Sequence, residues 1–207
     1  MACVAISLCI NYSDYLAQAL PTNRGLFSHY YVITEQSDIN TIEIATKHNC
    51  TIIFTESRLT NGAKFNKSGM IQEAQQFVHK QHPDSWISLI DADIGLPANL
   101  WSCANLQTLN KSALYGITRI RYDTKTDYEN NKANTKSQHN SSIPIGYFQL
   151  YYDKSKYYAT WSKNCSTCDM DFMRDFRSLH MIRNIKCEHY GPTKTNWDGR
   201  VSGVWQS

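Results

Sequence analysis

The sequence has no long hydrophobic run. Its N-terminal apolar stretch, Cys3 to Ile10, is about eight residues long and lacks a basic leader, whereas a helix that crosses a membrane needs roughly 20 consecutive apolar residues. We therefore expect no membrane span and no secretory signal peptide.

Charge is scarce and nearly balanced. Charged residues make up 19% of the chain, and lysine plus arginine exceed aspartate plus glutamate by 21 to 18. This excess is too small and too dispersed to indicate a nucleic-acid or membrane-surface partner. The 42% of hydrophobic and 12% of aromatic residues suffice for a sizeable core and exclude a disordered or collagen-like chain. With 207 residues, the chain is expected to fold as one domain.

The sequence also lacks the even set of cysteines that is typical of a disulfide scaffold. It has seven, mostly inside apolar segments: Cys3, Cys9, Cys50, Cys103, Cys165, Cys168 and Cys187. Buried free thiols suit a reducing compartment. We therefore expect a cytoplasmic protein.

The first half contains a regular alternation of short apolar runs and helical segments. We expect strands at Cys3–Cys9, His29–Thr34, Thr51–Thr55 and Trp86–Ile90, and helices at Ser13–Leu20, Asp38–His48 and Ser68–His82. Ser13 and Asp38 are the expected N-caps, and Pro83 ends the third helix. This alternation predicts an α/β fold with right-handed crossovers and a parallel sheet covered by helices on both faces. Ligands bind at the carboxyl ends of the strands in such sheets.

The second half is less regular. We expect a short helix at Ala98–Leu109, strands at Ala113–Arg119 and Ile143–Tyr152, a helix at Asp169–Arg183 and an irregular tail at Glu188–Ser207. The last helix would have an apolar face made of Phe172, Phe176, Leu179 and Ile182. The polar stretch Tyr122–Ser142 holds little that could pack. It is interpreted as a long surface loop that is either a substrate lid or disordered.

Two carboxylates follow the last of the predicted parallel strands. Asp91-Ala92-Asp93 comes directly after Trp86–Ile90, and repulsion between two carboxylates at one strand end is relieved by a cation or a proton. If the chain were a nucleotide-sugar enzyme, a Mg²⁺ or Mn²⁺ ion held there would bridge the diphosphate and stabilise the leaving group. The alternative is an aspartate turn without a ligand, since aspartate is common in turns.

Two further segments carry groups suited to this chemistry. The run Lys64-Phe65-Asn66-Lys67-Ser68-Gly69 combines cations, an amide and a helix start, and it fits a phosphate or a nucleoside. A helix capped by Ser68 with solvated lysines explains this run as well. His189, late in the chain, could complete a metal site begun by Asp91 and Asp93. The other six histidines are interpreted as surface or capping residues: His29, His48, His79, His82, His139 and His180.

The segment Cys165–Phe172 opens the last predicted helix. A carboxylate at this helix N-terminus that faced the ligand edge of the sheet could take a proton from an acceptor hydroxyl. Capping of the helix by Asp169 is the alternative. A competing interpretation uses Cys165, Cys168, Cys187 and His189 as a zinc site, because the Cys-x-x-Cys spacing suits zinc.

Taken in order, these segments resemble the nucleotide-diphospho-sugar transferases of the glycosyltransferase-A fold. The nearer likeness is to small family-2-like domains of large algal viruses and phages. The matching segments span nearly the whole chain: Cys3–Asn11, Phe65–Gly69, Trp86–Asp93 with Leu96-Pro97, Gly146–Leu150, Asp169–Phe172, and His189 with Asn196–Arg200.

The resemblance implies a Rossmann-like, mostly parallel central sheet flanked by helices, with a small antiparallel acceptor-side portion. One domain over residues 1–207 would have a donor-binding half at about 1–97 and an acceptor-side half at about 98–207. For a viral protein the expected compartment is the host cytoplasm.

The resemblance also assigns roles to residues. Donor-binding residues would be Asn11, Thr34, Glu35, Asn66, Lys67, Asp91, Ala92 and Asp93, and the ligands of a Mn²⁺ or Mg²⁺ ion would be Asp91, Asp93 and His189. Asp169 is the implied catalytic base and Asp171 its nearest competitor. The base assignment stays open because many relatives have Glu-Asp where this chain has Cys168-Asp169.

The resulting hypothesis is a metal-dependent glycosyltransferase. It would move a hexose from a nucleotide-diphosphate sugar, with a UDP-sugar favoured, to a hydroxyl of a glycan acceptor. A carboxylate base opposite a departing diphosphate predicts single displacement with inversion at the anomeric carbon. The alternatives are a zinc-stabilised binding module without catalysis, an inactive glycan-binding relative, and a sugar-nucleotide transferase. The last normally begins with a glycine-rich basic loop, where this chain has Asn11-Tyr12-Ser13-Asp14.

Overall fold

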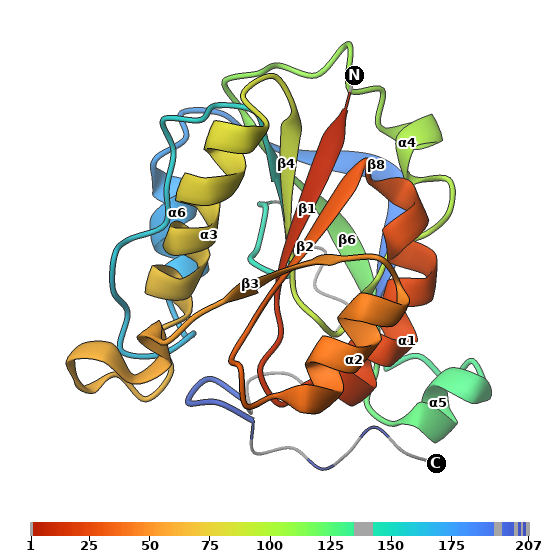
Figure 1. Ribbon diagram of the computed structural model, residues 1–207. Helices are drawn as coiled ribbons and strands as arrows, with labels where there is room; N and C mark the ends of the chain where they lie inside the picture. The colour runs from red at the N-terminus through yellow and green to blue at the C-terminus, as the bar shows by residue number, and fades with distance from the viewer. Residues whose placement is uncertain (1, 135–142, 193–195, 201–202, 204, 206–207) are drawn as a thin grey trace.

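The chain folds around a central sheet that has eight strands in the described part of the molecule. Figure 1 shows the computed structural model, which describes residues 2–134, 143–192, 196–200, 203 and 205. The strands are β1 (Cys3–Leu8), β2 (His29–Thr34), β3 (Thr51–Phe54), β4 (Trp86–Ile90), β5 (Ile94–Gly95), β6 (Leu114–Tyr122), β7 (Phe148–Tyr151) and β8 (Leu179–Tyr190). The α-helices are α1 (Ser13–Asn23), α2 (Ile39–Lys47), α3 (Lys67–Gln81), α4 (Leu100–Cys103), α5 (Lys125–Glu129) and α6 (Cys168–Arg174), with 3₁₀ turns η1 (Arg24–Leu26) and η2 (Ser57–Gly62).

The sheet has a parallel half and a mixed half, in the order β3-β2-β1-β4-β7-β6-β8-β5. β1 runs parallel to its neighbours β2 and β4, and β3 runs parallel to β2. Beyond β4, β7 is antiparallel to both β4 and β6, while β8 is parallel to β6 and antiparallel to β5. The predicted α/β fold, with a parallel first half and an antiparallel portion in the second, is confirmed.

Helices cover both faces of the sheet (Figure 1). On one face Leu16 of α1 packs in the same buried cluster as Val32 of β2. On the other face Val78 of α3 and Phe172 of α6 pack in a cluster with Ile6 of β1. The central strands are therefore buried on both sides, which explains their continuous apolar sequence. None of the described helices is both long and apolar enough to cross a membrane.

The starts of α2 and α3 depend on side-chain caps. Asp38 caps α2 as predicted, because its Oδ1 accepts a hydrogen bond from the Thr41 amide at 3.3 Å. α3 is capped by Asn66 rather than Ser68, since Asn66 Oδ1 accepts from the Gly69 amide at 3.1 Å. The cap of α3 was therefore assigned two residues too late.

Both ends of α1 differ from the prediction. Ser13 is the first helical residue, and the N-cap position belongs to Tyr12, which makes no side-chain cap. The helix continues through Pro21 to Asn23 instead of stopping before the proline. A tertiary contact explains the longer helix, because the buried Asn23 side chain donates to the Ile94 carbonyl at 2.7 Å.

The predicted helix Asp169–Arg183 is confirmed as far as Arg174 and is wrong beyond it. α6 ends at Arg174, and the chain then enters β8, which pairs along β6 with a register shift between Ile117 and Thr118. The apolar spacing of this segment fits a helix, but pairing with β6 satisfies its backbone and overrides the local pattern. β8 also takes in Glu188, His189 and Tyr190, so the predicted irregular tail begins at Gly191 at the earliest, three residues later than predicted.

Other elements in the second half have different bounds. The helix predicted at Ala98–Leu109 is the single turn α4. The strand predicted at Ala113–Arg119 is β6, which continues three residues further, to Tyr122. Of the strand predicted at Ile143–Tyr152, only β7 forms. The predicted loop Tyr122–Ser142 contains α5, which Thr124 caps. Residues 135–142 lie outside the described residues, and so does the prediction of a lid there.

His79 corrects the interpretation of the six histidines. Its side chain is 5% exposed, and its Nε2 lies 2.8 Å from the Tyr151 hydroxyl. Because the Gln75 amide donates to that hydroxyl at 2.7 Å, the Tyr151 proton is directed at a neutral imidazole. The remaining described histidines agree with the prediction, with His29 and His180 exposed and His48 and His82 at the C-cap positions of α2 and α3, while His139 lies outside the described residues.

His79 predicts an acid-sensitive fold. Burial, together with the charge of Lys154, lowers the pKa of His79 to about 4, so the unfolded chain binds a proton at this residue before the folded chain does. The contribution of neutral His79 to the free energy of unfolding is then fully present above about pH 6.5 and is lost as the pH falls toward 4. Between pH 7 and pH 5 the loss from this group is about 2 kcal/mol.

Urea unfolding at the two pH values measures this effect. The wild type should lose about 2 kcal/mol more than His79→Gln, while His180→Gln, at an exposed position, should behave like the wild type. Equal losses in the wild type and His79→Gln would refute the assignment.

Candidate functional site

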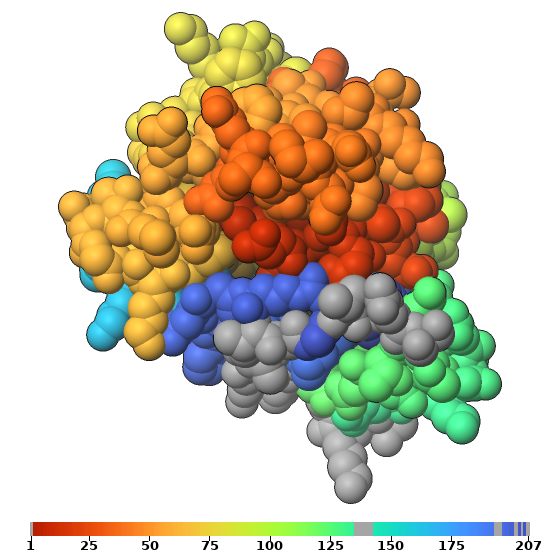
Figure 2. Space-filling model, turned by 60° about the horizontal axis from the view of Figure 1, so that its bottom comes forward, coloured from red at the N-terminus to blue at the C-terminus, as the bar shows by residue number. Residues whose placement is uncertain are grey.

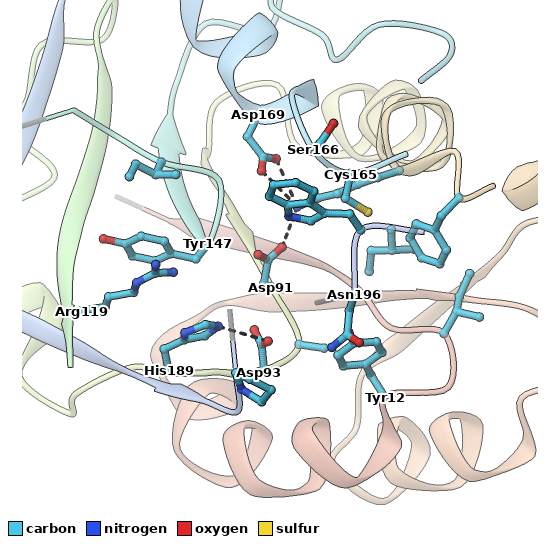
Figure 3. A pocket seen from close by; sticks show the side chains of 18 of the residues that line it. Tyr12, Asp91, Asp93, Arg119, Tyr147, Cys165, Ser166, Asp169, His189 and Asn196 are labelled. Atoms are coloured by element: carbon cyan, nitrogen blue, oxygen red, sulfur yellow. Dashed lines mark hydrogen bonds and ion pairs between the residues drawn. The ribbon is translucent and has the colours of Figure 1, made fainter. Parts of the chain in front are cut away.

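A pocket of about 320 Å³ opens at the carboxyl ends of β1 and β4. Its wall includes Leu8 from the end of β1, the turn Asp91–Asp93 after β4, Arg119 from β6, and Trp197 from the C-terminal segment. Figure 3 shows how side chains from these distant segments converge. Because adjacent parallel strands end at the same edge of a sheet, this is the position expected for a ligand site.

The two carboxylates of the Asp91-Ala92-Asp93 turn have different partners (Figure 3). Asp91 Oδ1 lies 2.9 Å from Lys67 Nζ, whereas Asp93 Oδ2 lies 3.3 Å from His189 Nε2. His189 reaches this place because β8 pairs with β5, in a register that sets it opposite Ile94. The sheet therefore brings together the acidic turn and a histidine almost 100 residues later.

Lys67 is a buried cation between two carboxylates. Its side chain is 9% exposed, and its Nζ also lies 3.1 Å from Asp169 Oδ1. Burial lowers the pKa of Lys67, but the charges of Asp169 and Asp91 outweigh it and hold that pKa well above the ordinary value. Burial raises the pKa of Asp91 to about 6, with Lys67 opposing the rise and the carboxylates of Asp169 and Asp93 adding to it. Lys67 is therefore charged and limits the repulsion within the site.

The Asp169 carboxylate is fixed by its neighbours. The Tyr158 hydroxyl, which is buried, lies 2.8 Å from Asp169 Oδ1 and 2.7 Å from Gln149 Oε1. Gly146 leaves the space that the carboxylate fills, because a Cβ at this position would lie 1.8 Å from Asp169 Cγ. Tyr158 was missed by sequence reasoning, and Gly146 appeared there only as part of a matching segment. No local signal marks either contact.

Not every predicted donor-binding residue lines the pocket. Ala92 and Lys67 do, but Asn11, Thr34, Glu35 and Asn66 do not. The backbone amide of Asn11 and the side-chain hydroxyl of Thr34 donate hydrogen bonds to Asp38. Glu35 forms an ion pair with Arg58, and Asn66 caps α3. The described contacts of these polar residues are thus with other parts of the chain, while the residues of this half that line the pocket include the largely apolar Leu8, Ile10, Tyr12 and Phe65.

Of the two candidate bases, only Asp169 faces the pocket. The Asp171 side chain is 54% exposed and pairs with Arg174 on the surface of α6 at 2.6 Å. Asp171 lies two residues after Asp169, and side chains two residues apart on an α-helix point to different sides of it. The geometry thus distinguishes two residues that the sequence left as competitors.

Asp93 and His189 are suited to a divalent cation. Asp93 Oδ1 and His189 Nδ1 are both buried without a hydrogen-bond partner in the described part of the chain, and a carboxylate with an imidazole is a donor set that Mn²⁺ accepts. Among the described residues, however, no three His, Cys, Asp or Glu side chains are gathered into a ready-made metal site. Asp91, the third predicted ligand, is directed toward Lys67.

The zinc alternative finds no support. Cys168 is the first residue of α6, Cys165 lies three residues before it, and Cys187 and His189 lie on β8. His189 is in contact with Asp93, and the described residues contain no cluster of three or more potential metal ligands. All seven cysteines are free thiols.

Residues 196–200, which we call the C-terminal segment, lie along one side of the site. Arg200 forms a two-pronged ion pair with Asp14 of α1 and stacks over the Tyr15 ring at 4.9 Å. Asp198 pairs with Lys64 at 2.6 Å. In Figure 2 the blue residues of this segment lie along the red N-terminal part of the chain. These contacts place Trp197 at the pocket wall.

No protein-family profile matches the sequence, and no curated protein matches it. Among solved structures, the chain is similar to glucosyl-3-phosphoglycerate synthase from Mycobacterium tuberculosis in complex with Mg²⁺ and UDP, with a TM-score of 0.50 and 12% identity over 84% of this chain and 64% of that one. It is also similar to mannosyl-3-phosphoglycerate synthase from Rubrobacter xylanophilus, with a TM-score of 0.44 and 13% identity over 58% of this chain and 41% of that one.

The chain spans less than two thirds of the length of either synthase. At this identity, the first likeness establishes the fold, which is the glycosyltransferase-A-like α/β fold that the sequence resemblance implied. The nearer likeness to viral and phage domains stays a prediction.

Proposed function

We propose that this chain is a metal-dependent glycosyltransferase that moves a hexose from a nucleotide-diphosphate sugar, with UDP favoured as the nucleotide, to a hydroxyl of an acceptor. The observation that carries the proposal is the shared pocket of the Asp91-Ala92-Asp93 turn and the Asp169 carboxylate, which Lys67 joins by ion pairs of 2.9 and 3.1 Å. The fold it shares with a synthase that was crystallised with Mg²⁺ and UDP supports the same assignment.

The donor diphosphate would lie at the acidic turn. Asp93 and His189, with Asp91 as a further ligand, would hold a Mn²⁺ or Mg²⁺ ion, which supplies positive charge to the departing diphosphate when bound. Lys67, already charged and directed into the pocket, would pair with a phosphate oxygen. The apolar wall of Leu8 and Ile10 would exclude water from this end of the site.

Asp169 would act as the general base. Its carboxylate takes the proton of the acceptor hydroxyl while the acceptor oxygen attacks the anomeric carbon, and the bond to the diphosphate breaks with its electron pair leaving on the diphosphate. Base and leaving group on opposite sides of the sugar give inversion in a single displacement. A product that keeps the anomeric configuration of the donor, seen by proton NMR, would exclude this mechanism.

The first test is calorimetric titration of a panel of nucleotide-diphosphate sugars with and without Mn²⁺. We expect one donor to bind only with metal, and the double variant Asp91→Asn, Asp93→Asn to weaken that binding by at least about 100-fold, which corresponds to about 2.7 kcal/mol.

Asp171→Asn is the control, because it makes the same kind of substitution once, at an exposed position outside the pocket. Its donor affinity should equal that of the wild type. The proposal fails when no donor binds in the presence of metal, or when the double variant binds the donor as tightly as Asp171→Asn does.

A further inference from the structure

Arg119 is a cation of the pocket wall that the proposed mechanism does not use. It lies on β6 and faces the pocket beside Tyr147 (Figure 3). No described residue forms an ion pair with it, and its Nε is buried without a hydrogen-bond partner. A guanidinium carries five N–H donors and no acceptor, so an unpaired one in a pocket presents its donors to a ligand.

The pocket carboxylates are committed to other partners. Asp93 lies against His189, while Asp91 and Asp169 share Lys67. The register partner of Arg119 across the sheet is Cys187, a thiol that burial keeps neutral by raising its pKa. Arg119 therefore holds a positive charge that no described residue neutralises, and a partly desolvated charge is costly without a counter-ion.

Stacking on Tyr147 fixes the guanidinium. Arg119 Cζ lies 4.7 Å from the centre of the Tyr147 ring, and the Tyr147 hydroxyl donates to the Ile117 carbonyl at 2.5 Å, which anchors the ring. Stacking occupies the flat face of a guanidinium and leaves its N–H edge open. That edge matches two oxygens of a phosphate or a carboxylate.

We infer that Arg119 anchors an oxyanion subsite, which binds a phosphate or carboxylate group of a substrate. The inference deepens the proposed function and rests on it, because the oxyanion arrives with one of the two substrates. Position favours the acceptor, since β6 is separated from β4 by β7 and the donor diphosphate already has Lys67 and a metal ion as partners. The acceptor is then an anionic sugar or another anionic hydroxyl compound rather than a neutral glycan.

Two titrations distinguish the sources of the oxyanion. UDP with Mg²⁺ is titrated into the wild type, Arg119→Gln and Arg121→Gln, and inorganic phosphate is then titrated into each protein in the presence of excess Mg²⁺ and UDP. Arg121→Gln is the matched control, because it removes the same charge from the same strand at a residue that pairs with Asp123 and does not line the pocket. Circular dichroism checks folding, and Arg119→Lys serves as a second variant that keeps the charge but not the two-pronged edge.

We expect phosphate to bind the loaded wild type, and Arg119→Gln to weaken that binding by at least about tenfold while Arg121→Gln changes it by less than about twofold. The phosphate affinity of Arg119→Lys should lie between the affinities of these two variants. Loss of UDP affinity in Arg119→Gln, with no phosphate binding to any loaded protein, would assign the oxyanion to the donor diphosphate instead.

The inference is overturned when Arg119→Gln matches Arg121→Gln in both titrations. A wild type that binds phosphate through Arg119 but binds no nucleotide with metal present would refute the proposed function and leave the oxyanion subsite in place. The two failures are therefore distinguishable.

Discussion

Replacement of Asp169 by asparagine is expected to lower the kcat of glycosyl transfer, measured as formation of nucleoside diphosphate, by about 10³-fold. The Kd of the donor should change by less than about threefold. Asparagine keeps the shape of the side chain and its contact with Tyr158, but it cannot take a proton from the acceptor. Because the proposed donor contacts lie at Asp91 and Asp93, donor binding should survive. Initial rates with the donor found by titration, together with its calorimetric Kd, measure both quantities.

The control for this prediction is Asp171→Asn, which should retain kcat within about twofold because its exposed carboxylate lies outside the pocket. Gly146→Ala offers an independent check, since its methyl group would displace the Asp169 carboxylate, and a misplacement of about 1 Å can cost about 100-fold in rate. A variant Asp169→Asn with more than a tenth of the wild-type kcat would show that another group is the base.

Replacement of Lys67 by methionine is expected to lower the free energy of unfolding by about 2 kcal/mol at pH 7 and to abolish donor binding. Methionine fills the same space, but it leaves Asp91 and Asp169 near each other without a counter-ion. Removal of one partner of a fully buried ion pair costs about 3–5 kcal/mol. The expected loss of about 2 kcal/mol is smaller because the Asp91 side chain is 37% exposed, so water screens part of its charge. Urea unfolding measures the change.

Lys64→Met is the matched control, three residues earlier in the chain. Lys64 also pairs with a carboxylate, that of Asp198, but both side chains are well exposed, and such surface pairs contribute about 0–1 kcal/mol. This variant should lose less than about 0.5 kcal/mol and should keep its donor affinity. An equal loss in both variants would mean that the buried network around Lys67 does not stabilise the site.

Local sequence patterns were sufficient to predict the first half of the molecule. The apolar runs at Cys3–Cys9 and Trp86–Ile90 are buried on both faces of the sheet, so their lack of alternation indicated central parallel strands. A parallel arrangement then places the residues after each strand at a common edge. The position of Asp91 and Asp93 directly after such a strand therefore predicts that they lie at the ligand edge of the sheet.

The same reasoning failed where a contact between distant segments competed with a local pattern. The segment after α6 has helical apolar spacing, yet it forms β8 because β6 offers it a strand to pair with. Asn11 and Thr34 are polar residues at strand ends, as a nucleoside site would need, yet neither lines the pocket, and the Asn11 backbone amide and the Thr34 hydroxyl donate to Asp38. Local patterns describe what a segment can form, and pairing partners decide which possibility is realised.

The sequence by itself determined the α/β class, the acidic turn after β4 and the carboxylate at the start of α6, because each depends on residues that are neighbours along the chain. Only the tertiary structure decided that His189 meets Asp93, that Lys67 joins Asp91 to Asp169, and that Arg119 has no ion-pair partner among the described residues. These contacts depend on strand order and register. Strand order and register follow from the burial and backbone pairing of the whole sheet, which no single segment encodes.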